Sequence, residues 1–151
     1  MFSFIAGHIS FDLISKNASI VSAWLGVVKS LVEIVSPTYG QVRSMNVKGW
    51  DAPFNLPLRL PDIPPISIYG REYIDLFGAD KIESAPFSAI SQVGECYWLV
   101  ANESLLEEVP DTKRQEIRCY FGEDSFMADG HWKYRDGRAL SFDFSNSLCL
   151  D

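Results

Sequence analysis

The run FSAISQVGECYWLVA, residues 87–101, decides the fold because it holds two strand-like segments joined by a minimal turn. Phe87–Val93 and Cys96–Ala101 are rich in β-branched and aromatic residues, and only Gly94-Glu95 separates them. A two-residue break that contains glycine is typical of a β-hairpin, whose strands are antiparallel. The second segment contains YWLV, which is apolar throughout, as in a central strand. The sequence therefore predicts an antiparallel sheet with this strand inside it.

The longest helix is predicted well upstream of this hairpin. Asn17 or Ser19 can accept hydrogen bonds from its first free amides. Pro37 cannot continue a helix, so the end is expected just before it, at Val35 or Ser36. Apolar residues recur at intervals of three and four, which places them along one helical face; they are Ile20, Val21, Trp24, Val27, Val28, Leu31, Val32 and Val35.

Three further helices are expected, two before the hairpin and one after it. Arg71–Phe77 has helical apolar spacing, with Gly78 at the position where a left-handed C-terminal cap is needed. A second short helix, Asp80–Glu83, follows it. Downstream of the hairpin, Asp111–Phe121 is predicted to form a helix that its first residue caps and that Gly122 ends.

Additional strands are expected near both ends of the chain and after the long helix. Residues 9–13 alternate between apolar and polar side chains, and a possible strand over 41–47 follows the turn after the long helix. A hairpin is predicted near the C-terminus, where a three-residue loop at 135–137 puts all large apolar side chains on one face; a two-residue loop would put them on opposite faces. These side chains are Trp132, Tyr134, Leu140, Phe142 and Phe144.

The segment 53–65 contains five of the eight prolines, which exclude a helix or a central strand. Its apolar residues indicate an ordered, irregular crossing that lies against the core, so we place no domain boundary there. The order of elements predicts an α+β fold, a mostly antiparallel sheet with helices packed on one side, in a single domain that spans residues 1–151.

The charge of the chain limits the classes of partner that it can bind. The 151 residues carry a formal net charge of −7, and the pI is near 4.8. The resulting field repels phosphate backbones and anionic lipid surfaces and attracts basic proteins, so no nucleic-acid or membrane partner is expected. The apolar start of the chain lacks the basic flank of a signal peptide, and no apolar run is long enough to cross a bilayer. The cytosol is therefore the expected compartment.

Few residues can support catalysis. His8 and His131 are the only histidines, and neither belongs to a motif that binds a metal or activates a nucleophile. We therefore expect no catalytic residue, no cofactor and no metal site, and interpret the chain as a binding protein. The alternative is a small hydrolase with an unrecognised pocket that uses His131 with Asp124 or Asp129.

The cysteines Cys96, Cys119 and Cys149 are odd in number and widely spaced, which fits neither a disulfide framework nor a zinc site. They are expected to be reduced and mostly buried. Cys119 stands beside Arg118, which can activate a thiol, but we expect the apolar face of its helix to hide the sulfur.

Acidic and aromatic side chains form the candidate partner-binding site. The acids gather between residues 103 and 124 in a spacing that fits no EF-hand loop, so a solvated face or a contact surface for a basic protein is favoured over a metal site or acid–base chemistry. Large aromatic residues can anchor an interface, although core packing is an equally good interpretation of these and of Trp98. The candidates are Glu103, Glu107, Glu108, Asp111, Glu123, Asp124, Trp50 and Phe54.

Several motifs together resemble a bacterial protein family. LPDIPPISIYGREYIDLFG at 60–78 is followed by Ser84-Ala85-Pro86, and SPTYG at 36–40 and YFGEDSF at 120–126 extend the pattern. In these motifs the chain resembles the polymorphic-toxin immunity proteins, in particular immunity protein family fifty-two. That family is associated with contact-dependent and type VI secretion effectors.

This resemblance implies a protein that binds a cognate toxin in the cytosol and blocks its active site or substrate path, without a cofactor. No toxin-contacting residue can be assigned from the resemblance, because the matching motifs consist of glycines and prolines that form the fold. An adaptor or chaperone that escorts a secreted effector is the alternative binding role.

Overall fold

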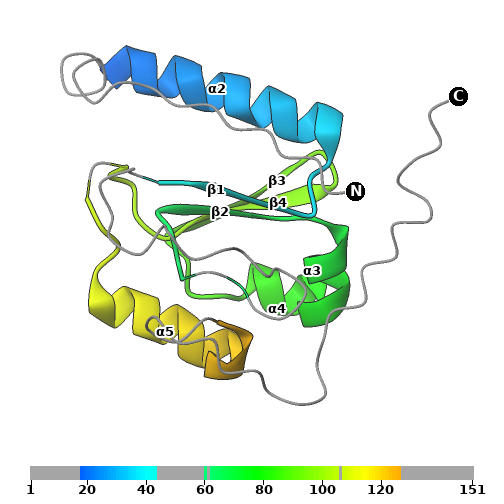
Figure 1. Ribbon diagram of the computed structural model, residues 1–151, viewed down its shortest axis with the longest axis vertical. Coiled ribbons are helices and arrows are strands. Elements are labelled where there is room, and N and C mark those ends of the chain that lie inside the picture. The colour runs from blue at the N-terminus through cyan, green and yellow to red at the C-terminus, as the bar shows by residue number, and fades with distance from the viewer. Residues whose placement is uncertain (1–17, 44–59, 61, 106, 127–151) are drawn as a thin grey trace, which may run out of the picture.

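The protein is built around a four-stranded sheet, seen here in a computed structural model that describes residues 18–43, 60, 62–105 and 107–126 (Figure 1). Every pair of neighbouring strands is antiparallel, as predicted. The strands are β1 (Tyr39–Val42), β2 (Ile66–Tyr69), β3 (Ala89–Val93) and β4 (Cys96–Val100), in the spatial order β1-β2-β4-β3.

The predicted hairpin is confirmed as β3 and β4. Val93 pairs with Cys96, so Gly94 and Glu95 alone make the turn. Gly94 has a φ of 59°, in the left-handed region, and a glycine in the first central position is what a type II′ hairpin turn requires. β4 lies between β2 and β3, and its first four residues are buried. The apolar run YWLV is therefore a central strand.

Strand β2 is the main element that the sequence analysis did not predict. All four of its residues are buried, and it pairs with β1 on one side and β4 on the other. It begins directly after Pro65, where the proline-rich segment ends. Four residues are too few to display a period, and the pairing that stabilises them comes from residues 24 or more positions away along the chain, so local signals do not reveal β2.

Five helices complete the described part of the chain. α2 (Ala18–Val35) and β1 come before β2, α3 (Arg71–Phe77) and α4 (Ala79–Glu83) come directly after it, and α5 (Asp111–Phe121) with the short 3-10 helix η1 (Glu123–Ser125) follows β4. The predicted ends of α2, α3 and α5 are confirmed. Gly78 and Gly122 have positive φ, but their ψ angles of 137° and 124° lie outside the left-handed helical region, which corrects the predicted cap at Gly78.

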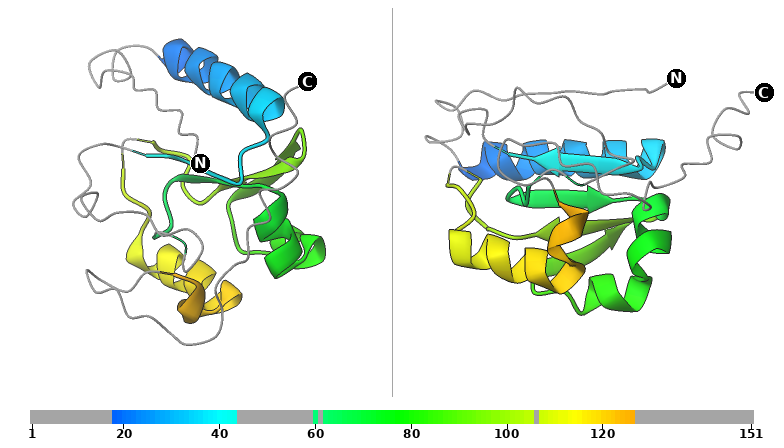
Figure 2. Two further views of the ribbon diagram at one scale, coloured as in Figure 1. Left: turned by 45° about the vertical axis from the view of Figure 1, so that its right-hand side comes forward. Right: turned by 60° about the horizontal axis from the view of Figure 1, so that its bottom comes forward.

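Helices cover both faces of the sheet, which corrects the expectation that they pack on one side. α2 lies over one face, and α3, α4 and α5 lie over the other (Figures 1 and 2). The cause is the apolar character of the central strands, because alternate residues of β2 and β4 point to opposite faces and both sets need cover. The α2-side core consists of Val32, Val42, Ile66, Ile68, Val93, Cys96 and Trp98.

The α5-side core is larger and includes the described part of the proline-rich crossing. Leu60 and Ile63 are buried in it, which confirms that these residues lie against the core. Its other buried members are Tyr69, Tyr73, Ile82, Ala85, Tyr97, Leu99, Ala101, Val109, Ile117, Phe121 and Phe126.

Two local expectations are corrected. The helix α5 has Pro110 as its N-cap residue and Asp111 as its first helical residue, and Asp111 makes no capping hydrogen bond. Of the two candidate caps of α2, Ser19 lies inside the helix, and Asn17 lies outside the described residues. The predicted strand at 41–47 starts earlier, at Tyr39, and its part beyond Arg43 lies outside the described residues. The predicted strand at 9–13 and the hairpin at 132–144 also lie outside them.

None of the described helices has the length and apolarity that a bilayer crossing needs.

Candidate partner-binding site

The candidate site is the outer side of α5 together with the loop that leads into it from β4. Between Asn102 and Phe126 the chain has seven acidic and three basic residues. Ile117 and Phe121, four residues apart, face the α5-side core and are buried. Residues on the other side of the helix are therefore turned to solvent, and this is where the carboxylates gather.

Three glutamates in the loop are exposed and make no ion pair with a described residue. No cation in the described part of the chain lies within ion-pair distance of Glu103, Glu107 or Glu108. The backbone under them is held in place, because the Asn102 side-chain amide donates to the carbonyl of Glu108 at 3.3 Å, and the Asn102 carbonyl oxygen Oδ1 accepts from the Ser104 amide at 3.3 Å. The loop thus presents three negative charges on an anchored backbone. We call Glu103, Glu107 and Glu108 the loop glutamates.

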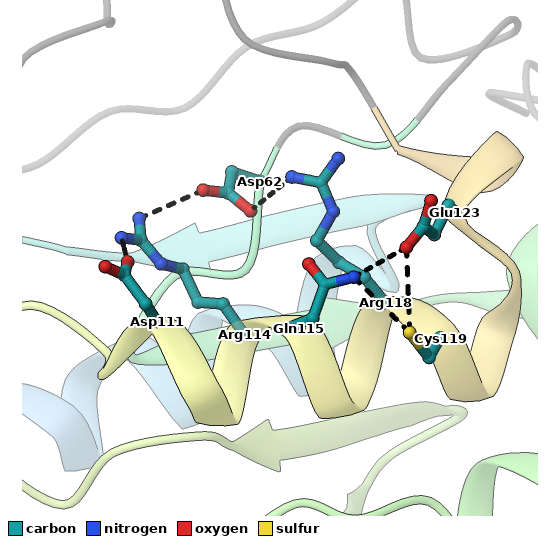
Figure 3. A network of polar contacts seen from close by, with 7 residues as sticks. All are labelled: Asp62, Asp111, Arg114, Gln115, Arg118, Cys119 and Glu123. Carbon is teal, nitrogen blue, oxygen red and sulfur yellow. Dashed lines mark hydrogen bonds and ion pairs between the residues drawn. The ribbon is translucent and has the colours of Figure 1, made fainter.

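Three of the acids on α5 and η1 are instead engaged by polar side chains of α5. Asp111 accepts a hydrogen bond from Arg114, and Glu116 pairs with Lys113 at 3.0 Å. Glu123 accepts from the Gln115 amide at 2.6 Å (Figure 3). The charges of Asp111 and Glu116 are therefore balanced by neighbouring cations. Glu123, whose partner is a neutral amide, keeps its negative charge, as do the loop glutamates.

Asp62 ties the crossing segment to α5. Its two carboxylate oxygens accept from Arg114 at 3.1 Å and from Arg118 at 3.3 Å (Figure 3). The guanidinium of Arg118 also lies 5.8 Å from the centre of the Phe126 ring. Close by, the Leu60 amide donates to the carbonyl of Ser125 at 2.8 Å. These contacts fix the helix that carries the acidic face against the rest of the molecule.

The contacts of Asp62 with Arg114 and Arg118, which we call the Asp62 clamp, were not predicted from the sequence. Arg114 and Arg118 are four residues apart, which places two guanidinium groups on the same side of a helix. That spacing was the available signal. Their shared partner, Asp62, is more than fifty residues away in sequence, and only the folded chain brings it to them.

Replacing Asp62 with asparagine is expected to lower the free energy of unfolding by about 1 kcal/mol, because two partly buried ion pairs are lost while the shape is kept. Asp62 is 44% exposed, and its partners Arg114 and Arg118 are 26% and 18% exposed. Urea denaturation measures the change, which should shrink in 1 M NaCl. Asp75→Asn is the matched control, since the Arg71–Asp75 pair is 3.9 Å long and open to water, and it should change stability by less than about 0.3 kcal/mol. Equal effects of the two substitutions would contradict the clamp.

Cys119 is exposed, which corrects the expectation that its helix hides the sulfur. It lies two residues from both Ile117 and Phe121, about half a turn from the buried side of α5. Its sulfur is 3.4 Å from the Gln115 side-chain nitrogen and 3.6 Å from a carboxylate oxygen of Glu123. Cys96 is buried as expected, and burial, together with the nearby charges of Glu95 and Glu72, raises the pKa of its thiol to about 11.

The outer side of α5 has the form of a contact surface. Its hollow is shallow and open, whereas a small-molecule site encloses most of its ligand; the lining residues are Asp111, Thr112, Gln115, Glu116 and Cys119. The described ranges contain no group of three or more residues that could hold a metal ion. This side of α5 is therefore a shallow, solvent-facing area whose two carboxylates, Asp111 and Glu116, are already ion-paired, and it lies beside the loop glutamates.

The predicted site residues divide into three groups. The loop glutamates lie together, Asp111 and Glu123 continue the same acidic side along α5 and η1, and Asp124 belongs to η1. Trp50 and Phe54 lie outside the described residues, as do both histidines. Trp98 is 3% exposed in the α2-side core, so it is a core residue and no surface anchor.

No family model matches the sequence, and neither the curated proteins nor the solved structures include one that is significantly similar to it.

Proposed function

We propose that the protein is an immunity protein that neutralises a cognate secreted toxin in the cytosol by binding it. The observation that carries the proposal is the set of loop glutamates, whose three carboxylates are exposed and without a charged partner among the described residues. Because these carboxylates make no ion pair within the described chain, none has to break when cations of a partner approach them. The resemblance of several sequence motifs to those of the toxin-immunity family supports the same role.

The toxin in this proposal is basic, like many proteins that act on nucleic acids. A net charge of −7 attracts such a protein from a distance, and the loop glutamates orient its approach toward α5. Arginine or lysine side chains of the toxin pair with the loop glutamates, and the open hollow on α5 receives adjacent side chains. The toxin is inhibited because the bound protein covers its active site or substrate path, so no chemical step is needed.

The test is to purify the tagged protein from its source cell, identify the captured protein and reconstitute the pair. We expect a one-to-one complex in which the captured protein loses its toxic activity, with an association rate that falls as NaCl rises from 50 to 500 mM. The fall is expected because salt screens the attraction between opposite charges. An association rate that ignores ionic strength would remove the electrostatic argument. A complex in which the captured protein stays active would indicate the adaptor role instead.

A further inference from the structure

Helix α2 is held to the sheet by few buried side chains for its length. Of residues 19–35, only Val32 is buried. α5 is shorter, with 11 residues against 18, yet it buries Ile117 and Phe121 and is tied to Asp62 by two ion pairs. No ion pair joins α2 to another described element. α2 therefore has less buried contact per residue than α5.

The chain directly after α2 is held firmly. The Pro37 carbonyl accepts from the Cys96 thiol at 3.6 Å, and the Thr38 carbonyl accepts from the Gly70 amide at 2.9 Å. Strand β1 begins with the next residue and pairs with β2 over all four of its positions. The boundary between the weakly held helix and the firmly held strand thus falls at Ser36.

The backbone at this boundary is strained. Ser36 has a φ of 44°, and among the described residues it is the only one other than glycine with a positive φ. A side chain at such a φ costs free energy that glycine avoids, and the proline that follows restricts the backbone further. Strain of this kind persists only while surrounding contacts hold it. Here the Ser36 amide donates to the Val32 carbonyl at 2.9 Å, so the strain depends on the last turn of α2.

We propose that α2 is a lid that swings away from the sheet about Ser36 while the rest of the domain stays folded. The movement breaks the contacts of Val32 and opens the apolar face of the central strands, where Ile68, Cys96 and Trp98 are buried. α3, α4 and α5 keep their places, because they pack on the opposite face of the sheet (Figure 2). Opening of one element ahead of global unfolding is expected where that element has few buried contacts.

The Cys96 thiol reports this opening. It is 1% exposed and belongs to the same core as Val32, so a reagent reaches it only after the core has opened. Labelling with iodoacetamide at pH 8 gives the rate, and peptide mass spectrometry separates Cys96 from the exposed Cys119, which serves as the reference for an unprotected thiol.

We expect Cys96 to react at least about tenfold faster than global unfolding allows. The rate should also rise less steeply with urea than the global unfolding equilibrium does, because lifting one helix exposes less surface than unfolding the whole domain. A labelling rate that follows global unfolding at every urea concentration would overturn the proposal.

A pair of core variants ties the opening to α2. Val32→Ala removes the buried side chain of the lid and should speed the labelling of Cys96 about tenfold. Ile117→Val trims the core on the other side of the sheet, so it should lower the global stability yet leave the labelling rate within about twofold of the wild type. If Ile117→Val accelerated labelling by as much as it favours global unfolding, the lid would be ruled out.

A pair of variants at Ser36 tests the hinge. Ser36→Gly relieves the strain of the closed form and should slow the labelling of Cys96 about threefold. Ser36→Ala is the matched control, since alanine keeps the Cβ that causes the strain, and its labelling rate should equal that of the wild type. Equal rates for the two variants would contradict a hinge at Ser36.

Discussion

Replacing Gly70 with alanine should lower the free energy of unfolding by about 3 kcal/mol and the Tm by about 6–12 °C, the largest stability effect that we expect from one methyl group in this chain. Gly70 stands between β2 and α3, and the chain just before β1 passes directly over it. A Cβ at this position would collide with the carbonyl oxygen of Pro37 and lie 3.0 Å from the Thr38 Cα. Both obstacles are backbone atoms and cannot rotate away.

The collision is costly because Gly70 connects three elements. Its amide donates to the carbonyl of Thr38 at 2.9 Å, and its own carbonyl accepts from the Tyr73 and Ile74 amides at 3.1 and 3.0 Å. Moving Gly70 aside to make room for a methyl group therefore strains the entry to β1 and the first turn of α3 together. Circular dichroism at increasing urea concentration and temperature measures the loss.

Gly26→Ala provides the matched control for Gly70→Ala. Gly26 lies inside α2, and a Cβ built there meets no atom within 4 Å. Alanine is the better helix former by about 1 kcal/mol, so this variant should be more stable than the wild type by about 0.5–1 kcal/mol. If Gly70→Ala differed from the wild type by less than about 0.5 kcal/mol, the close approach of the Pro37 and Gly70 backbones would be wrong.

Local signals in the sequence account for most of the described elements. The helix ends at Val35, Phe77 and Phe121 follow from a proline or a glycine just beyond them, and the β3–β4 turn follows from Gly94-Glu95. Each of these depends on a few adjacent residues whose backbone preferences differ strongly from the rest. Such signals can be read without knowing what the element contacts.

The features that the sequence analysis missed depend on contacts between distant segments. Ile66–Tyr69 becomes a strand because β1 and β4 pair with it from both sides. Whether helices cover one face of a sheet or two depends on whether both sides of its central strands are apolar, and β2 is central only because of the strand order β1-β2-β4-β3. Neither property can be predicted from a few adjacent residues.

The candidate site likewise combines features that the sequence predicts with features that depend on the folded chain. The sequence reveals which residues are acidic, but the ion pairs decide which of them are available to a partner. Asp111 pairs with Arg114 and Glu116 with Lys113, whereas the loop glutamates make no ion pair in the described chain. Cys119 illustrates the point for burial, because its place on the exposed side of α5 depends on which side of the helix meets the sheet.

Reversing the three loop glutamates in the variant Glu103→Lys, Glu107→Lys and Glu108→Lys should slow association with the toxin by about 10- to 100-fold at 50 mM NaCl. The reversal turns local attraction for a basic partner into repulsion where the first contacts form. The free energy of unfolding should change by less than about 0.5 kcal/mol, because no ion pair among the described residues is broken. Stopped-flow fluorescence gives the association rate, and its dependence on salt should flatten.

A second triple variant separates the effect of the loop from that of total charge. Glu33→Lys, Asp75→Lys and Asp80→Lys change the net charge by the same amount, and all three residues are exposed on α2, α3 and α4, away from the loop. Steering depends on where the charge lies, since 50 mM NaCl largely screens charges more than about 14 Å apart. This control should therefore slow association by less than about threefold. If both variants slowed it equally, net charge alone would account for the attraction and the loop glutamates would not be the contact site.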